Sequence, residues 1–178
     1  MPDGSGVAKD VAKKAASLKK RRFNKNKLPS RHTTVGPDRA PHRSYLYAMG
    51  LTEKEINQPL VGIATCWNEA APCNISLSRQ AQAAKKGVKA AGGTPREFTT
   101  ITVTDGIAMG HEGMKSSLVS REIIADSVEL TMRGHCYDAL VGLAGCDKSL
   151  PGMMLSLIHI SEPTRRTPIS YAVVCLKK

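Results

Sequence analysis

The stretch Ala139-Leu140-Val141-Gly142-Leu143-Ala144, followed directly by Gly145-Cys146-Asp147-Lys148, decides the fold class of this chain. Six apolar residues in a row are typical of a strand that is buried on both faces of a sheet. The four residues that follow include a thiol, a carboxylate and an amine, groups that bind or neutralise metals and anions. We therefore expect an α/β enzyme with a metal site at the end of this strand.

Two further strands are expected upstream, and helical patterns separate all three. Residues 60–64 are a short apolar run, and residues 98–103 are a Thr-rich run closed by Thr104-Asp105-Gly106. A helix over residues 117–133 is expected before the last strand. Between the first two strands, apolar residues recur at helical spacing at Leu77, Ala81, Ala84, Val88 and Ala91. The order strand, helix, strand, helix, strand predicts a parallel sheet with flanking helices.

A polar cluster follows each of the three predicted strands. Residues 66–73 follow the first strand, Asp105 the second and Cys146-Asp147-Lys148 the third. Because the carboxyl ends of parallel strands meet at one edge of a sheet, we expect the three clusters to lie close together. His111 and Glu112, in a glycine-flanked loop, are either acid–base groups or ordinary loop surface.

The residue types in these clusters leave two interpretations open. Cys73 and Cys146 are either ligands of an iron–sulfur cluster or buried structural thiols, because no CxxC pair distinguishes the two. Asp105 and Asp147 are either ligands of a hard cation such as Mg²⁺ or caps of the turns in which they lie. Lys148, next to Asp147, neutralises that carboxylate in the simplest interpretation.

The positive charge of the chain is concentrated in its first residues. The 178 residues include 26 Lys and Arg against 15 Asp and Glu, a net charge of +11. Residues 1–43 carry twelve basic and three acidic side chains, whereas residues 44–156 carry ten and eleven. A basic surface over the whole domain, as expected for a dedicated nucleic-acid binder, is therefore not supported. A non-catalytic module with a basic nucleic-acid-binding arm is kept as the hypothesis of another class.

The cysteine count and the hydropathy of the chain bear on its cellular location. Five cysteines, an odd number, in a chain without a secretory signal segment favour a reducing environment. No apolar run reaches the ~20 residues that span a bilayer. We therefore expect a cytoplasmic protein without membrane association. If the basic residues 1–27 are a transit peptide rather than a disordered extension, the location becomes mitochondrial or plastid.

Five motifs, taken in order, carry a resemblance to a known family. They are the segments at residues 39–44, 62–74, 105–111, 120–127 and 145–153. In this order they resemble the dihydroxy-acid dehydratase family, which includes phosphogluconate dehydratase. Several motifs in one order are far more specific than any single motif.

The resemblance implies an activity and a set of ligands. It implies a lyase that dehydrates a 2,3-dihydroxy acid of the 2,3-dihydroxy-3-methylbutanoate type to the 2-oxo acid, in valine and isoleucine synthesis. A sugar-acid dehydratase acting on 6-phosphogluconate is the alternative. Cys73 and Cys146 are then ligands of a [2Fe–2S] cluster, with [4Fe–4S] as the alternative type. Asp105, Asp147 and Lys148, the last as a carboxylated lysine, are then ligands of Mg²⁺.

The resemblance also sets the expected boundaries. Residues 28–155 correspond to a truncated N-terminal α/β domain, preceded by the basic extension. Residues 156–178, with no helical periodicity and with two prolines, are interpreted as a non-family tail that arose as a sequence artefact. The third cluster cysteine, a further Mg²⁺ ligand, the catalytic serine and a second, barrel-like domain are then missing. We therefore expect no catalytic residue and no activity in this chain alone, and a homodimer for the full-length protein.

Overall fold

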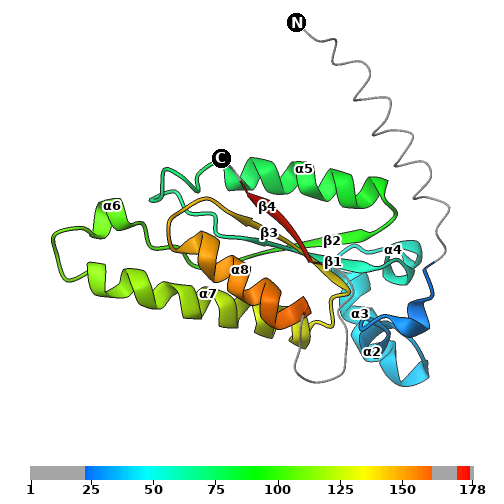
Figure 1. Cartoon of the computed structure of the whole chain (residues 1–178). Helices are drawn as coiled ribbons and strands as arrows, with labels where there is room; N and C mark the ends of the chain where they lie inside the picture. The colour runs from blue at the N-terminus through cyan, green and yellow to red at the C-terminus, as the bar shows by residue number, and fades with distance from the viewer. Residues whose placement is uncertain (1–22, 162–171, 177–178) are drawn as a thin grey trace, which may run out of the picture.

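The computed structural model describes residues 23–161 and 172–176, and a parallel sheet lies at its centre. The strand order is β2-β1-β3-β4. Figure 1 shows α5 on one face of the sheet and α7 with α8 on the other. The strands are β1 (Leu60–Thr65), β2 (Thr94–Thr99), β3 (Ala139–Ala144) and β4 (Ala172–Leu176). The expected α/β fold with flanking helices is confirmed.

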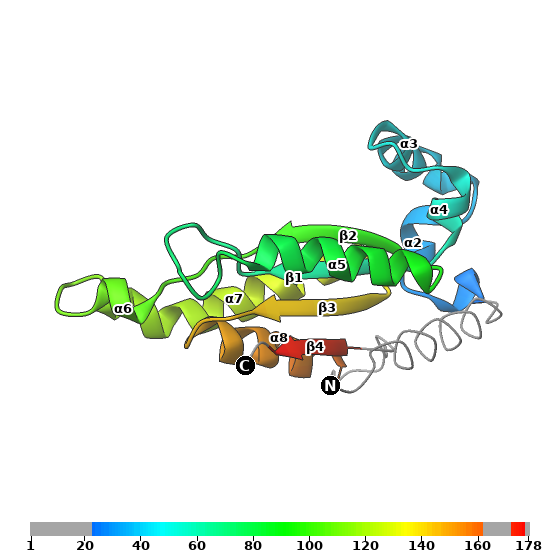
Figure 2. The same cartoon turned by 90° about the horizontal axis from the view of Figure 1, so that it is seen from above.

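The helices fall into two groups. Figure 2 shows short helices beyond the amino ends of the strands, whereas α6 lies beyond the carboxyl ends. The short helices are α2 (Arg31–Thr34), α3 (Ala40–Ala48) and α4 (Glu53–Asn57), with the 3₁₀ turns η1 (Lys25–Lys27) and η2 (Pro37–Arg39). The others are α5 (Leu77–Ala90), α6 (Asp105–Ala108), α7 (Met114–Gly134) and α8 (Ser149–Ser161). Within the described part of the chain, none is both long and apolar enough to cross a membrane.

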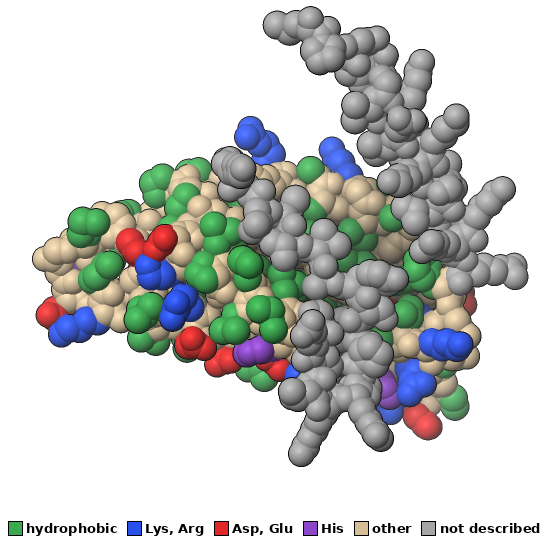
Figure 3. All heavy atoms as spheres, in the orientation of Figure 1, with side chains coloured by type: hydrophobic (Ala, Val, Ile, Leu, Met, Phe, Trp, Pro, Cys, Tyr) green, Lys and Arg blue, Asp and Glu red, His purple; other side chains and the backbone are tan. Residues whose placement is uncertain are grey.

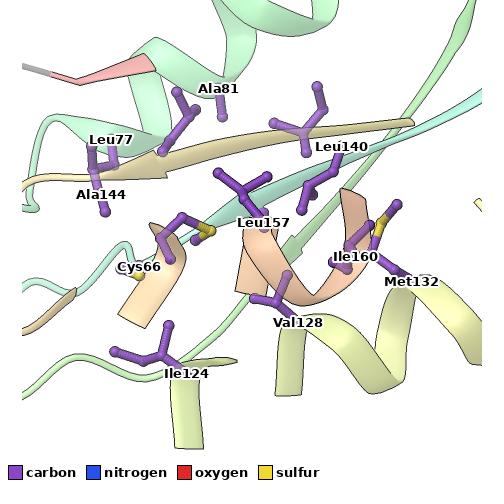
Figure 4. Packing of buried hydrophobic residues seen from close by; sticks show 14 residues of the cluster. Cys66, Leu77, Ala81, Ile124, Val128, Met132, Leu140, Ala144, Leu157 and Ile160 are labelled. Carbon is purple, nitrogen blue, oxygen red and sulfur yellow. The ribbon is translucent and has the colours of Figure 1, made fainter. Parts of the chain in front are cut away.

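The hydrophobic core lies on both faces of β1 and β3. Leu77 and Ala81 of α5 cover one face, and α7 and α8 cover the other (Figure 4). The α7 contribution comes from three fully buried side chains at steps of four residues, Ile124, Val128 and Met132. Each fully buried side chain of this size stabilises the fold by about 1.5–3 kcal/mol. The helices therefore fix the sheet, and the sheet fixes the loops at its carboxyl edge.

A buried carboxylate anchors the N-terminal segment to the amino edge of the sheet. Asp138, just before β3, accepts hydrogen bonds from the Ser30 N–H at 2.8 Å and from the Ser30 hydroxyl at 2.6 Å. It also accepts one from the Leu60 N–H at 2.7 Å. Three donors satisfy a carboxylate that would be costly to bury alone. Residues near the start of the described chain are therefore part of the folded domain.

The position of β2 differs from the sequence prediction. The strand was expected over residues 98–103, but it covers Thr94–Thr99 and begins directly after Gly92-Gly93. Pro95 and the charged side chains after it disfavour a strand in the sequence. They are tolerated here because β2 lies at the edge of the sheet. Residues 100–104 lie outside the sheet and form the loop that follows β2.

The end of the described chain also differs. The lack of helical periodicity expected after residue 155 is wrong for the first residues of that segment, because α8 continues to Ser161. Met153, Leu157 and Ile160 lie at steps of four and three and are buried against the sheet. Residues 162–171 and most of the basic extension, residues 1–22, lie outside the described residues. The interpretation of residues 156–178 as a non-family tail stays a prediction.

Candidate functional site

Three loops meet at the carboxyl ends of the strands, as the alternation of strands and helices along the chain predicts. They follow β1, β2 and β3, respectively. The fully buried Asn74 joins the first two loops, because its amide donates to the Cys66 carbonyl at 2.7 Å and to the Thr102 hydroxyl at 3.0 Å. Cys146 joins the last two, because its Sγ donates to the Thr104 hydroxyl at 3.5 Å. The predicted clusters therefore form one site.

The structure brings the two predicted cluster cysteines together. Cys146 is buried, with 6% of its surface exposed, and its N–H donates to the Ser149 hydroxyl at the start of α8 at 3.0 Å. Cys73 is half-buried, and burial raises the pKa of its thiol. The neighbouring Cys146 thiol raises this pKa further, whereas the Thr104 hydroxyl lowers it. The two thiols, which come from separate loops, are therefore neighbours.

Gly145 allows this approach of the loops. A Cβ at this position would lie 2.4 Å from the Cys73 carbonyl oxygen and 3.0 Å from Asn74 Oδ1. No residue with a side chain fits at that distance without displacing the Cys73 loop. The Asn74 Oδ1 atom is buried and has no hydrogen-bond donor within the described residues. The glycine therefore permits the close approach of the two loops that carry the thiols.

The three predicted cation ligands also lie together. Lys148 Nζ donates to Asp105 Oδ2 at 2.8 Å and also to the Asp147 carboxylate. About a fifth of the Lys148 and Asp105 side chains is exposed, against 68% of Asp147. Lys148 and Ser117 lower the pKa of Asp105, and the two carboxylates raise the pKa of Lys148. Figure 3 shows acidic and basic side chains grouped at the α6 end of the molecule.

The donor chemistry matches the two metal groups that the sequence suggested. Two adjacent thiols suit a soft metal or an iron–sulfur cluster. Asp105 and Asp147 supply the oxygen donors that a hard cation such as Mg²⁺ prefers, and the Lys148 ammonium lies between them. Each set is incomplete, since no three His, Cys, Asp or Glu side chains converge on a metal position in the part of the chain that the structure describes.

The site also contains residues that the sequence did not single out. The hydroxyl of Ser117, in the first turn of α7, donates to Asp105 Oδ1. Thr104 contacts Cys146, as described above. Thr104 could have been suspected from its place directly before Asp105, but nothing in the sequence distinguishes Ser117 from its serine neighbours.

The ring of His111 makes two contacts within its own loop. Its Nδ1 accepts from the Gly113 N–H at 3.0 Å, so that Nε2 carries the proton and donates to the Ile107 carbonyl at 2.8 Å. Glu112 pairs with Lys115 on the surface. Glu112 therefore fits the loop-surface interpretation, whereas the acid–base interpretation of His111, which also lines the pocket described next, stays a prediction. A pocket of about 290 Å³ adjoins this loop and is lined by residues including Asn68, Ala71, Thr104 and Ser116.

Comparison with known proteins agrees with the resemblance. Residues 58–166 match the family described as "Dihydroxy-acid/6-phosphogluconate dehydratase N-terminal", a match that runs past the boundary expected at residue 155. The dihydroxy-acid dehydratase of Parvibaculum lavamentivorans is 82% identical over 142 residues, which are 80% of this chain and 25% of the relative.

Two further relatives bear the same name. That of Dinoroseobacter shibae is 79% identical over 145 residues, 82% of this chain and 25% of the relative. That of Metallosphaera sedula is 55% identical over 129 residues, 72% of this chain and 23% of the relative. The chain spans about a quarter of the length of these relatives. Since the family match covers well over half of its residues, the chain belongs to the dihydroxy-acid/6-phosphogluconate dehydratase family.

Proposed function

We propose that the protein to which this segment belongs is a hydro-lyase that dehydrates a 2,3-dihydroxy acid to the 2-oxo acid. The observation that carries the proposal is the meeting, at one sheet edge, of two thiols with two carboxylates bridged by a lysine. The relatives are named dihydroxy-acid dehydratases, which favours a substrate of the 2,3-dihydroxy-3-methylbutanoate type over a sugar acid. Such a product serves valine and isoleucine synthesis.

We assign Cys73 and Cys146 as two ligands of a [2Fe–2S] cluster, with [4Fe–4S] as the alternative type. Loss of hydroxide from an alcohol needs an electrophile at the departing oxygen, and the bound cluster supplies a Lewis acid there. The chain holds the two sulfurs in place. Ser149 fixes the Cys146 backbone, Thr104 contacts the Cys146 sulfur, and Gly145 admits the Cys73 loop.

We assign Asp105, Asp147 and Lys148 to Mg²⁺. In its ammonium form, Lys148 occupies the space between the two carboxylates and competes with a cation for them. Carboxylation reverses this: neutral Nζ forms a bond to the carbon of CO₂ and loses a proton. The product is an anion with two oxygen donors. The three side chains would then present oxygen ligands to one hard cation.

The pocket beside these residues is the proposed position of the substrate. Its lining is mainly apolar, with residues such as Ile107 and Ala108, and it includes Thr104 and Ser116. Its volume of about 290 Å³ suits a small acid. Its lining includes Thr104, which contacts Cys146, so an occupant would lie close to the thiols.

A chimera tests the proposal. Residues 28–155 of this chain replace the matching segment of the Parvibaculum lavamentivorans relative, and the protein is reconstituted with iron and sulfide without oxygen. We expect a brown protein that converts 2,3-dihydroxy-3-methylbutanoate to its 2-oxo acid. Cys73→Ser and Cys146→Ser should lose cluster iron, and Asp105→Asn should lose activity while retaining iron.

Cys136→Ser is the matched control, because this half-buried thiol lies before β3, at the opposite edge of the sheet. It should retain both iron and activity. Full iron content in both ligand variants would reject the cluster assignment. A chimera with full iron but no dehydration of the diol acid would reject the proposed reaction. The homodimer, the cytoplasmic location and the inactivity of this chain alone stay predictions.

A further inference from the structure

We propose that Ser117 is a positioning residue of the cation site. Its hydroxyl holds one oxygen of Asp105 and thereby turns the other oxygen toward the cation. The inference rests on the cation site proposed above, and it adds a residue outside the ligand set.

The two oxygens of Asp105 have separate partners. Oδ1 accepts from the Ser117 hydroxyl, and Oδ2 accepts from Lys148 Nζ at 2.8 Å. Ser117 is 1% exposed, so water does not compete for its hydroxyl. The carboxylate cannot rotate without breaking one of these contacts. Asp105 begins a helix of only four residues, α6, which offers its side chain little support of its own.

The turn between α6 and α7 brings Ser117 to Asp105. Gly110 adopts a φ of +82°, and the two ring contacts of His111 close the turn between Ile107 and Gly113. The first turn of α7 therefore returns alongside α6 (Figure 1). Two residues twelve positions apart come into contact through a turn that is fixed by its own hydrogen bonds.

A purely structural role predicts a different contact for this hydroxyl. Buried serines in helices commonly donate to a carbonyl of the preceding turn. Ser120, one turn further along α7 and 2% exposed, does so by donating to the Ser117 carbonyl at 2.6 Å. Ser117 instead directs its hydroxyl out of the helix to a carboxylate. Partners that hydrogen-bond to a metal ligand typically change metal affinity by about 10–100-fold when they are removed.

The test measures binding of Mn²⁺ to the 178-residue chain by electron paramagnetic resonance, in bicarbonate buffer that supplies the CO₂ needed to carboxylate Lys148. We expect Ser117→Ala to raise the dissociation constant by about 10–100-fold. Ser117→Thr retains the hydroxyl and should recover most of the affinity. Ser120→Ala is the matched control and should bind Mn²⁺ like the unaltered chain. Thermal unfolding of each variant separates a loss of stability from a loss of affinity.

The outcomes distinguish the inference from the function on which it rests. If the unaltered chain binds no Mn²⁺, or if Asp105→Asn does not weaken binding, both the proposed cation site and the role of Ser117 are rejected. If Asp105→Asn weakens binding but Ser117→Ala does not, the inference alone is overturned. Equal weakening by Ser117→Ala and Ser120→Ala also overturns it. Ser117→Cys, which keeps the volume but donates weakly, replaces the alanine variant if that variant does not fold.

Discussion

Replacement of Gly145 by alanine tests whether the spacing of the two thiols depends on the loop that joins β3 to α8. The added Cβ would lie 2.4 Å from the Cys73 carbonyl oxygen, whereas ordinary contacts begin at 3.4 Å. The Cys73 loop must therefore retreat by about 1 Å. Forcing a methyl group into a packed region costs about 1–3 kcal/mol. We expect Gly145→Ala to lower the free energy of unfolding by this amount.

The same displacement should weaken metal binding by the thiol pair. Cd²⁺ binds thiolates, and its binding is followed by the thiolate-to-metal charge-transfer absorption. We expect Gly145→Ala to weaken Cd²⁺ binding about tenfold or more, the scale seen when the surroundings of a metal ligand are disturbed. Urea unfolding of the same samples gives the stability change.

Gly87→Ala is the matched control for this prediction. Gly87 is exposed within α5, and a Cβ there would meet no atom within 4 Å. Alanine is favoured over glycine in a helix by about 0.8–1 kcal/mol, so this variant should be more stable and should bind Cd²⁺ unchanged. The reasoning is refuted if Gly145→Ala changes the unfolding free energy by less than about 0.5 kcal/mol and leaves Cd²⁺ affinity intact.

Two further predictions concern the amino edge of the sheet. Asp138→Ala leaves three buried donors of Ser30 and Leu60 without an acceptor, so it should lower the free energy of unfolding in urea by about 3 kcal/mol or more. The control, Glu97→Ala, breaks a partly exposed pair with Lys85 and should lower it by less than about 1 kcal/mol. Equal losses in the two variants would contradict this prediction. Burial lowers the pKa of Lys25 to about 8, and Asp138 opposes the shift. Between pH 8 and pH 10.5 this lysine is therefore protonated in the unfolded chain but largely neutral in the folded one. Because the unfolded chain binds more protons there, this lysine makes the free energy of unfolding rise with pH in that window. The difference in unfolding free energy between Lys25→Met and the unaltered chain should therefore change from pH 7 to pH 10, and a constant difference would contradict the assignment.

The sequence was sufficient where its signal is local and both faces of an element are buried. Residues 139–144 form β3 with the bounds predicted. A continuous apolar run of that length is typical of a strand that is buried on both faces. The approach of the loops that carry Cys73, Asp105 and Cys146 followed from the alternation of strands and helices along the chain, since parallel strands place their carboxyl ends together. The order of strands and helices along the chain therefore predicts which loops form the site.

The misplaced elements depend on tertiary context that the local pattern does not contain. Pro95 reads as a strand breaker unless β2 is known to be an edge strand. The apolar face of α8 continues through Leu157 and Ile160, but the prolines that follow hid this short pattern. Ser117 could not be found because its partner is decided by the turn around His111, not by spacing.

The contact of Ser30 with Asp138 has a consequence for the synthesis of the chain. The two residues are 108 positions apart. At about 5–20 residues per second, a ribosome completes Asp138 roughly 5–20 s after Ser30. During that interval Ser30, just before α2, cannot form its two hydrogen bonds, because Asp138, which accepts them, has not yet been synthesised. This part of the chain is consequently open to chaperones and proteases for longer than its early place in the sequence suggests.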